Sequence, residues 1–412
     1  MEQKVKLGVI GLGQRGSSML AHVILNFDDV EITAICDPYS DRVEKSAKDV
    51  EEKRGTTPFC TNDYKEVLCR DDVEAVYIAS SWETHVEVAI AALKAGKATG
   101  LEVGGAYSLK ELEDLVETQE ATGTPFMLLE NCCYGENELF ATAAARAGLF
   151  GTIVHCSGAY GHDLRDEIAK GNIIRHYRLR NYTTRNAENY PTHELGPIAK
   201  ILNINRGNRM TSLVSVASKA CGMTEYIKAH PELVEKDPTL ADRTFKQGDI
   251  VTTIITCQNG ETIMLKLDTT LPRSYSREVT VRGTKGFYSQ DTNTVFVDGM
   301  KEQWKPVDYV KDCLDNAKEY YDKYMPEYWR NLTEEDRKKG HGGMDSFMFR
   351  EFLDAYKEGR EMPIDVYDCA AWMAVTFLSE QSIASGGAPC IIPDFTNGKY
   401  LIREPKDVIK LN

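Results

Sequence analysis

The fold is decided by residues 5–16, VKLGVIGLGQRG, near the start of a chain of 412 residues. An apolar run that is typical of a buried strand leads directly into Gly11, Gly13 and Gly16, which have the spacing G-x-G-x-x-G. In dinucleotide-binding folds the first glycine permits a tight turn, the second lets a pyrophosphate approach the backbone, and the third lets the next helix meet the strand. The stretch therefore predicts the beginning of a dinucleotide-binding domain.

The segment that follows the glycine turn supports this prediction. It reads as a helix over residues 17–25 and a second buried strand over residues 30–36, with Asp37 directly after that strand. An acidic residue at this place hydrogen-bonds the hydroxyls of the adenine ribose and repels a 2′-phosphate. The alternative is an ordinary glycine loop with a surface acid, which does not account for the complete order of elements. We therefore expect NAD rather than NADP as the cofactor.

Length and composition limit the class of protein. A chain of 412 residues exceeds one compact core of the usual size, so two domains are expected. The hydrophobic fraction of 42% and the charged fraction of 27% are typical of a globular enzyme. A net charge of −14 disfavours nucleic acid and anionic membranes as partners, and no apolar run is long enough to span a bilayer.

Cysteine usage and the beginning of the chain bear on location. The 11 cysteines are scattered singly except for Cys132 and Cys133, which suits a reducing compartment better than a disulfide framework. The first strand begins within a few residues of the start, which leaves no room for a secretory signal. We expect a cytoplasmic protein. No metal site is expected, because the sequence contains neither C-x-x-C nor H-E-x-x-H.

Strands and helices continue to alternate up to Asn131. Further strands are expected over residues 73–79, 99–103 and 125–129, and helices over residues 86–95 and 109–122. This alternation predicts a parallel sheet built from right-handed crossovers. Polar residues follow three of the strands, at residues 80–85, at Glu102 and at residues 130–131. They should line one nucleotide crevice, although each of them alone is equally well explained as a solvated loop residue.

The pattern changes after Asn131. A helix over residues 136–147 precedes long strands that lie close together in the sequence, and Asn259-Gly260 predicts a hairpin turn between two of them. Later helices are expected at three places. The strands are expected over residues 151–160, 210–218, 249–257, 261–269, 277–283 and 294–297, and the later helices over residues 309–328, 344–358 and 367–385.

The predicted fold class is α/β with two domains. A Rossmann dinucleotide-binding domain covers residues 1–131, and an α+β domain with a largely antiparallel open sheet covers residues 132–412. The second domain is expected to bind the substrate and carry the catalytic residues. An open sheet face could support a dimer, so we expect a homo-oligomer.

The strongest catalytic candidates in the second domain lie in residues 189–193, Asn-Tyr-Pro-Thr-His. Pro197 favours a helix start nearby, which would place His193 at the positive end of the helix dipole. The dipole disfavours a second proton on the imidazole, and a neutral imidazole can act as a base. Tyr190 is close enough in sequence to share the pocket as an acid, a base or a substrate clamp. The alternative is a histidine that only caps the helix.

These residues carry a resemblance to known proteins. From Gly11 to Asn131 the chain resembles the NAD(P)-binding oxidoreductase family that includes glucose-fructose oxidoreductase and inositol dehydrogenase. Its dehydrogenases have Glu-Lys-Pro after the fifth strand, whereas this chain has Glu102-Val103-Gly104 and lacks the acid/base lysine. The glycosidase branch, glycoside hydrolase family 109, which is similar to bacterial α-N-acetylgalactosaminidase, also has Glu-Val at this place.

Several motifs extend the resemblance to family 109 over nearly the whole chain. They occur in the expected order, and two departures, Thr84 in place of tryptophan and Glu194 in place of glycine, leave the substrate specificity open. The motifs are YGHDLR at residues 160–165, YPTH at 190–193, NINRG at 203–207, PRSYSR at 272–277, HGGMD at 341–345, and Asp365 and Asp368 with Trp372.

The resemblance implies roles for individual residues. NAD contacts are implied for Gln14, Arg15, Asp37, Trp82, Glu83, Thr84, His85, Glu102, Val103, Asn131 and Tyr190, in addition to the turn glycines. Contacts with the sugar of a small-molecule glycoside are implied for Tyr160, Tyr190, Pro191, Thr192, His193 and Tyr275.

The resemblance also implies a redox-neutral hydrolysis. Transient oxidation of the C3 alcohol makes the C2 proton acidic, so the glycosidic group can be eliminated before water adds and the alcohol is restored. His193 is the candidate for the proton of the C3 hydroxyl, and Tyr190 and Tyr160 are candidates for C2 proton transfer or sugar positioning. NAD would stay bound between turnovers, and no pair of carboxylates is needed. Two alternatives remain: an NAD-dependent sugar or polyol dehydrogenase, and a non-catalytic NAD-binding sensor.

Overall fold

The computed structural model describes residues 4–300 and 313–411, and the chain forms two compact units. The first unit contains Met1–Tyr134 and Leu332–Ala370, and the second contains Gly135–Asn331 and Ala371–Asn412. The first unit thus includes a late segment as well as the beginning of the chain. The predicted division into domains after residue 131 stays a prediction.

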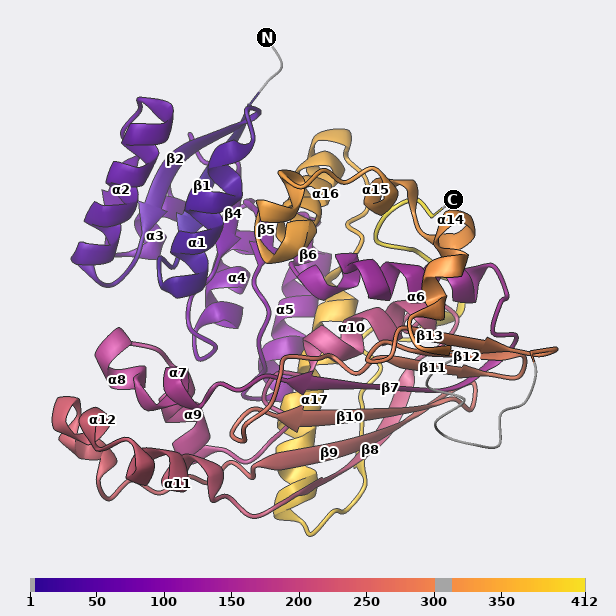
Figure 1. Cartoon of the computed structure of the whole chain (residues 1–412). Coiled ribbons are helices and arrows are strands. Elements are labelled where there is room, and N and C mark those ends of the chain that lie inside the picture. Colours follow the sequence, from indigo (N-terminus) through magenta and orange to yellow (C-terminus); the bar gives the residue numbers. More distant parts are fainter. Residues whose placement is uncertain (1–3, 301–312, 412) are drawn as a thin grey trace. The chain divides into compact units, whose positions relative to one another are not determined.

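The first unit contains a parallel sheet of six strands in the order β3-β2-β1-β4-β5-β6 (Figure 1). The strand order reverses between β1 and β4, and in such sheets a nucleotide binds at the carboxyl ends of the strands beside this reversal. The predicted Rossmann fold is confirmed. The strands are β1 (Val5–Ile10), β2 (Val30–Cys36), β3 (Phe59–Thr61), β4 (Ala75–Ile78), β5 (Ala98–Leu101) and β6 (Phe126–Leu128).

Helices connect these strands and pack in two groups. Helix α1 packs on α2, and α4 packs on α5, as expected when right-handed crossovers place the helices of the two halves on opposite faces. The sequence sets the ends of α5, because Ser108 and Glu111 form a capping box and Gly123 adopts the left-handed conformation at its C-cap. The helices are α1 (Gln14–His22), η1 (Ile24–Asn26), α2 (Ser40–Arg54), α3 (Tyr64–Leu68), α4 (His85–Lys94), α5 (Leu109–Thr122) and η2 (Asn131–Tyr134).

A late segment completes the first unit. It contains η5 (Asp336–Lys338), η6 (His341–Gly343) and α16 (Met344–Glu358). Phe349 of α16 stacks on Phe27 and meets the edge of Tyr77, with ring centroids 6.0 Å apart in both pairs. Arg350 donates to Asp29 at 3.0 Å. Burial of these aromatic rings and this ion pair hold α16 to the first unit, although more than 200 residues separate it from η2 in the sequence.

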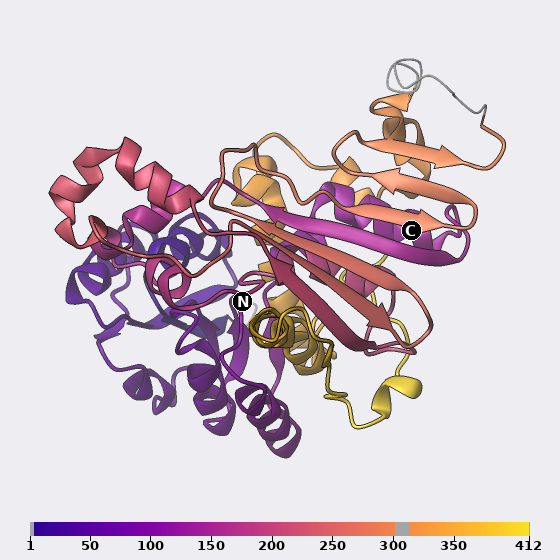
Figure 2. The same ribbon diagram turned by 90° about the horizontal axis from the view of Figure 1, so that it is seen from below.

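The second unit contains a mixed sheet of eight strands in the order β13-β12-β11-β7-β10-β9-β8-β14 (Figure 2). Among the described strands, β7 and β10 pair in parallel and the other neighbours pair antiparallel, which confirms the largely antiparallel sheet. The predicted hairpin at Asn259-Gly260 joins β9 to β10. The strands are β7 (Ile153–Gly161), β8 (Met210–Ala217), β9 (Ile250–Cys257), β10 (Thr262–Asp268), β11 (Thr280–Gly283), β12 (Gly286–Ser289), β13 (Thr294–Val297) and β14 (Cys390–Ile391).

Helices cover one face of this sheet. Helix α10 packs on β7, and Ser382 of α17 accepts a hydrogen bond from the backbone N–H of Ser215 in β8 at 2.9 Å. The helices of this unit include α6 (Glu136–Arg146), α7 (Arg165–Ala169), α8 (Gly171–Ile174), α9 (Arg178–Thr184), α10 (Thr192–Ile201), α11 (Gly222–Ala229), α12 (Pro231–Lys236), η3 (Pro238–Leu240), η7 (Lys399–Leu401) and most of α17 (Val366–Ala384).

The prediction of a single helix over residues 309–328 is wrong for residues 313–328, which the structure describes. Residues 309–312 lie outside the described residues, and the remainder forms η4 (Asn316–Tyr320), α14 (Tyr321–Tyr324) and α15 (Glu327–Arg330). Asp315 has a left-handed backbone, with φ of 62°. Pro326 forces Met325 into an extended conformation, which ends α14. Within the described residues, no helix is both long and apolar enough to cross a membrane.

Candidate functional site

The glycine turn has the geometry that its spacing predicts. Gly11 has a φ of +94°, and a Cβ there would lie 2.5 Å from the backbone of Ala79. A Cβ on Gly16 would lie 1.9 Å from the carbonyl oxygen of Gly11, so α1 can approach β1 only without a side chain at this place. Gly13 is the N-cap of α1, and a Cβ there would meet the Arg42 guanidinium at 3.5 Å. The turn therefore leaves the backbone at Gly13 open to a pyrophosphate.

Asp37 is held firmly beside this turn. It follows β2 and is only 3% exposed. One carboxylate oxygen accepts from the backbone N–H of Leu12 at 2.8 Å, and the other accepts from that of Tyr39 at 2.9 Å. Both bonds fix the carboxylate where an adenine ribose is bound in Rossmann folds. The turn and Asp37 together fit a dinucleotide of the NAD type.

Arg15 brings three of the predicted cofactor residues together. Its Nε donates to Glu102 at 2.9 Å, and its two terminal nitrogens donate to the two carboxylate oxygens of Asp345, each at 2.9 Å. Asn131 donates to Asp345 at 2.7 Å, and the Tyr77 hydroxyl donates to Glu102 at 2.9 Å. The network joins the glycine turn, the end of β5, η2 and the start of α16.

The two carboxylates of this network differ in pKa. Burial raises the pKa of Glu102, and the charge of Arg15 offsets this only in part. Burial would also raise the pKa of Asp345, but the charge of Arg15 and hydrogen bonds from His341 and Arg15 outweigh it and hold that pKa well below its ordinary value. The His341 Nδ1 lies 2.7 Å from Asp345. Asp345 is therefore the anion that keeps Arg15 in place.

The residues after β4 pack closely against Gly104. A Cβ on Gly104 would lie 2.4 Å from Cε1 of His85 and 2.5 Å from Cδ1 of Trp82. His85 is fully buried, and burial lowers its pKa to about 4, so it is a neutral imidazole. The proline that the resembling dehydrogenases have at this place would not fit here. This packing explains why Glu102-Val103 is followed by glycine in this chain.

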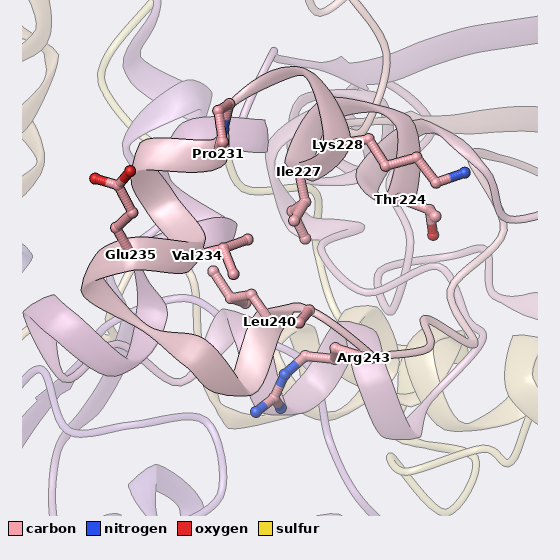
Figure 3. A pocket seen from close by; sticks show the side chains of 9 residues that line it. Thr224, Ile227, Lys228, Pro231, Val234, Glu235, Leu240 and Arg243 are labelled. Carbon is pink, nitrogen blue, oxygen red and sulfur yellow. The ribbon is translucent and has the colours of Figure 1, made fainter.

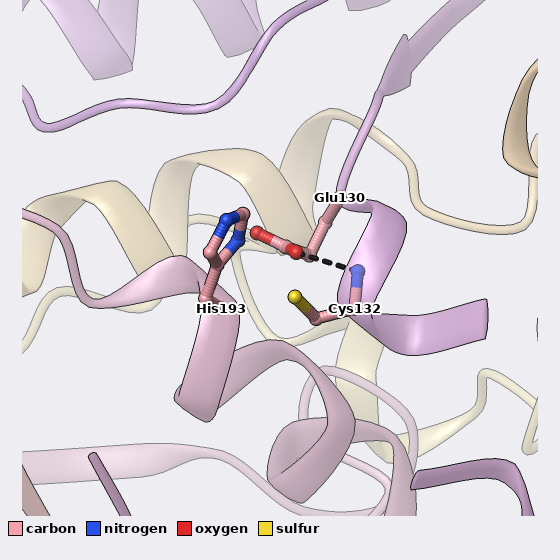
Figure 4. A group of neighbouring side chains, drawn as sticks. All are labelled: Glu130, Cys132 and His193. Atoms are coloured by element: carbon pink, nitrogen blue, oxygen red, sulfur yellow. Dashed lines mark hydrogen bonds between the residues drawn. The ribbon is translucent and has the colours of Figure 1, made fainter. Parts of the chain in front are cut away.

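The remaining predicted cofactor residues lie on nearby elements of the same unit. Gln14 is exposed as the first residue of α1, and Thr84 is exposed as the N-cap of α4. Glu83 is half-buried, and Val103 is buried after β5. Glu130 accepts a hydrogen bond from the backbone N–H of Cys132 at 2.9 Å, which orders the beginning of η2 (Figure 4).

In the second unit, the predicted catalytic residues form one aromatic cluster. The Tyr160 ring at the end of β7 lies 4.6 Å from the Tyr190 ring and 5.4 Å from the His193 ring. The rings of Tyr190 and His193 are 4.7 Å apart and nearly perpendicular. The structure thus brings the three predicted catalytic residues together in one cluster.

Helix α10 begins earlier than the sequence predicts. It starts at Thr192, with Pro191 as its N-cap, and Pro197 lies inside it. His193 therefore lies in the first turn, as Figure 4 shows, which is the positive end of the helix dipole that the sequence predicts. Pro197, inside the helix, has no N–H and so makes no α-helical hydrogen bond to the carbonyl four residues earlier.

Two further residues join the cluster without having been predicted for it. The His162 Nδ1 lies 3.2 Å from the Tyr160 hydroxyl. The Arg178 guanidinium lies 5.1 Å from the centre of the Tyr190 ring and is buried. His162 lies within the quoted motif YGHDLR, and its spacing of two from Tyr160 on a strand was a usable signal. Arg178 lies between motifs, and no pattern in the sequence singled it out.

Tyr275 borders the same cluster and is 48% exposed. Its ring lies 5.0 Å from that of His162 and 6.5 Å from that of Tyr160. Its hydroxyl accepts from Arg277 at 3.1 Å, and Arg277 in turn donates to the buried Glu138 at 2.5 Å. A buried ion pair thus holds a partly exposed tyrosine at the edge of the cluster.

A separate hollow lies between α11, α12 and η3, and Figure 3 shows its side chains. Its volume is about 420 Å³. None of the predicted site residues lines it. Its lining residues are Thr224, Ile227, Lys228, Pro231, Val234, Glu235, Leu240, Ala241 and Arg243.

Two known protein families match the chain, one in its N-terminal part and one in its C-terminal part. The family described as "Oxidoreductase family, NAD-binding Rossmann fold" matches residues 5–129, and the one described as "Glycosyl hydrolase 109, C-terminal domain" matches residues 134–402. The chain belongs to glycosyl hydrolase family 109. Family 109 membership confirms the resemblance that the motifs indicated.

Curated relatives match over almost the whole length. A glycosyl hydrolase family 109 protein of Stenotrophomonas maltophilia is 38% identical, and the match covers 98% of this chain and 91% of the relative. The α-N-acetylgalactosaminidase of Tannerella forsythia is 37% identical, with 97% and 88% covered. This family 109 chain is therefore similar to its relatives in both units.

Solved structures share the fold. The crystal structure of scyllo-inositol dehydrogenase from Lactobacillus casei, with bound cofactor NAD(H) and scyllo-inositol, has a TM-score of 0.64 to this chain. The sequences are 12% identical, and the match covers 95% of this chain and 99% of the other. The likeness confirms the fold class.

Proposed function

We propose that this family 109 chain is a glycosidase that releases terminal N-acetylgalactosamine, or a closely related sugar, from small glycosides by transient oxidation at C3. One observation carries the proposal: Tyr160, Tyr190 and His193 form a single cluster whose ring centres lie 4.6 to 5.4 Å apart. Family membership and the relatives that are named α-N-acetylgalactosaminidase support the choice of sugar.

NAD is the proposed resident cofactor. The open backbone at Gly13 would take the pyrophosphate, and the fixed carboxylate of Asp37 would take the adenine ribose. Asn131 and the Arg15 network line the strand ends of the same unit. When bound, NAD supplies the reversible oxidation of the C3 alcohol to a ketone, which makes the C2 proton acidic.

The chain's own side chains then have to move two protons. His193, in the first turn of α10, is proposed to hold the proton of the C3 hydroxyl while that carbon is oxidised. Tyr160 or Tyr190 is proposed to take the C2 proton, and the elimination of the glycosidic group follows. Tyr275, Pro191 and Thr192 are proposed to hold the sugar ring.

The absence of a lysine after Glu102 supports hydrolysis over net oxidation. The resembling dehydrogenases use that lysine as their acid/base, and Val103 stands in its place. Packing of Trp82 and His85 against Gly104 shapes this segment differently from Glu-Lys-Pro. An NAD-dependent sugar dehydrogenase is therefore the alternative that an experiment must distinguish from a hydrolase. The predicted homo-oligomer stays a prediction.

The test is release of nitrophenol from nitrophenyl N-acetyl-α-galactosaminide by the purified protein with no nucleotide added. Absorbance of NADH is followed in the same cuvette. Release without net formation of NADH is the expected result. If a panel of nitrophenyl glycosides gives no release while NADH accumulates with a free sugar, the protein is a dehydrogenase and the proposal is wrong.

A further inference from the structure

We propose that His162 is the proton acceptor of Tyr160, so that the Tyr160 oxygen, rather than that of Tyr190, removes the C2 proton of the sugar. The inference deepens the proposed function and rests on it. His162 acts through Tyr160 and is therefore a positioning and relay residue. The sequence leaves both Tyr160 and Tyr190 as candidates for the C2 proton, and the position of His162 favours Tyr160.

The geometry of the strand end carries the first step. Tyr160 lies at the end of β7, and His162 follows directly after the strand ends at Gly161. The two residues are two positions apart and their ring centres lie 5.8 Å apart, so their side chains leave the same side of the sheet. This is the face that α10 covers, because Gly158, two positions earlier, packs against Glu194 and Ile198 of that helix. The His162 Nδ1 lies 3.2 Å from the Tyr160 oxygen, within hydrogen-bond distance.

The surroundings of Tyr160 mean that its phenol needs a nearby proton acceptor before it can act as a base. Burial raises the pKa of Tyr160 to about 12, and the charge of Arg178 offsets this only in part. A phenol of this kind does not ionise by itself near neutral pH, so it can take a carbon-bound proton only when its own proton has somewhere to go. Arg178 would stabilise the negative charge that develops on the phenol oxygen.

The surroundings of His162 keep it ready to accept that proton. Burial lowers the pKa of His162, and the nearby charge of Arg178 on α9 and the ring of His193 on α10 act in the same direction. Glu167 on α7 and the adjacent Asp163 act in the opposite direction. The Tyr275 ring packs against the imidazole edge and carries no charge. The net effect is a neutral imidazole at cellular pH.

The protons and electrons balance through the cycle. The C2–H bond breaks, its proton goes to the Tyr160 oxygen, and the phenol proton goes to Nδ1 of His162. The electron pair left at C2 forms the double bond and expels the glycosidic oxygen from C1. Water then adds to C1 and gives its other proton to the released alkoxide. His162 returns its proton through Tyr160 to C2.

The test separates this proton step from the oxidation at C3. Exchange of the C2 hydrogen of N-acetylgalactosamine with D₂O is followed by NMR, together with nitrophenol release across pH. His162→Asn keeps a hydrogen-bond acceptor near the Nδ1 position but removes the base, and His162→Phe removes both. His155→Asn is the matched control, because His155 lies on the same strand, faces away from α10 and bonds Thr262 at 2.8 Å.

We expect both His162 variants to lose C2 exchange and kcat by about 10²-fold or more, with a small change in KM. The acid limb of the kcat/KM profile, which reports protonation of His162, should disappear in His162→Asn. Suppose the wild type is active, and His162→Asn still exchanges the C2 hydrogen fully and keeps the acid limb of its kcat/KM profile. That result would overturn the relay through His162 and leave the proposed function standing. If the wild type shows neither nitrophenol release nor exchange with any sugar of the panel, the proposed function fails and the relay fails with it.

Discussion

Arg15 binds both carboxylate oxygens of Asp345 at 2.9 Å, across 330 positions of the sequence. Arg15 lies in the first turn of α1, directly after the glycine turn, and Asp345 lies in the first turn of α16. The same guanidinium also binds Glu102, so two acids share one cation. The late segment of the chain therefore holds the turn that is proposed to bind NAD, and its contribution can be measured.

Replacing Asp345 with asparagine should loosen the first unit. Arg15 would keep only Glu102 as a charged partner, and Asn131 would lose its carboxylate acceptor. We expect the free energy of unfolding to fall by about 2 kcal/mol, since hydrogen bonds to charged groups contribute on this scale. Urea denaturation measures this change. Asp354→Asn, which removes a half-exposed pair with Arg350 on the same helix, should cost about 0.5 kcal/mol or less.

The same pair should make stability depend on pH at the acid end. The pKa of Asp345 is held well below its ordinary value in the folded protein, so its contribution is complete above the unfolded pKa of about 4. It is lost progressively as the pH falls below that value, because the unfolded chain then takes up a proton that the folded chain, with Asp345 paired to Arg15, does not. The free energy of unfolding is measured by urea denaturation at several pH values between about 5 and 3. It should decrease less steeply with falling pH in Asp345→Asn than in the wild type. Parallel curves would contradict this assignment.

Gly104→Ala should displace the residues that line the proposed cofactor site. The new Cβ would lie 2.4 Å from His85 and 2.5 Å from Trp82, and neither ring can move far because both are buried. We expect less NAD to remain with the purified protein, as measured by nucleotide content after denaturation. Gly96→Ala is the control, because a Cβ at Gly96 would meet no atom within 4 Å, and only the backbone, with a φ of +72°, disfavours a side chain there. It should cost about 1 kcal/mol of stability and leave the NAD content unchanged.

The sequence could predict what depends on local pattern. The glycine turn, the strand that precedes Asp37, and the helix over residues 109–122 all follow from local spacing and periodicity, and the structure has them close to where they are expected. Asp345 could not be placed beside Arg15, because no local pattern encodes a contact across 330 residues. His162 was within reach, since its position relative to Tyr160 on a strand fixes its face.

Glu138→Gln should weaken sugar binding through Tyr275. Glu138 is buried and accepts from Arg277 and Gln290, and Arg277 donates to the Tyr275 hydroxyl. Without the carboxylate the guanidinium is no longer fixed, so we expect KM for the nitrophenyl glycoside to rise about tenfold with little change in kcat. In combination with Tyr275→Phe the two effects should not add, because both act on one hydroxyl. Additive effects would show that Glu138 acts elsewhere.

His193→Ala should abolish turnover while the nucleotide stays bound. His193 lies in the second unit, whereas the glycine turn, Asp37 and the Arg15 network belong to the first, so the change leaves every proposed pyrophosphate and ribose contact in place. We expect kcat to fall by at least about 10²-fold, the usual contribution of a positioned acid or base. Bound NAD is counted after denaturation, and thermal melting checks that the variant is folded. Tyr190→Phe is the companion variant, because it keeps the ring that packs on His193 and removes only the hydroxyl. If Tyr190→Phe leaves both turnover and NAD content intact, Tyr190 is not part of the site. Unchanged turnover in His193→Ala would show that His193 is not the base for the C3 hydroxyl, and the proposed mechanism would then be wrong.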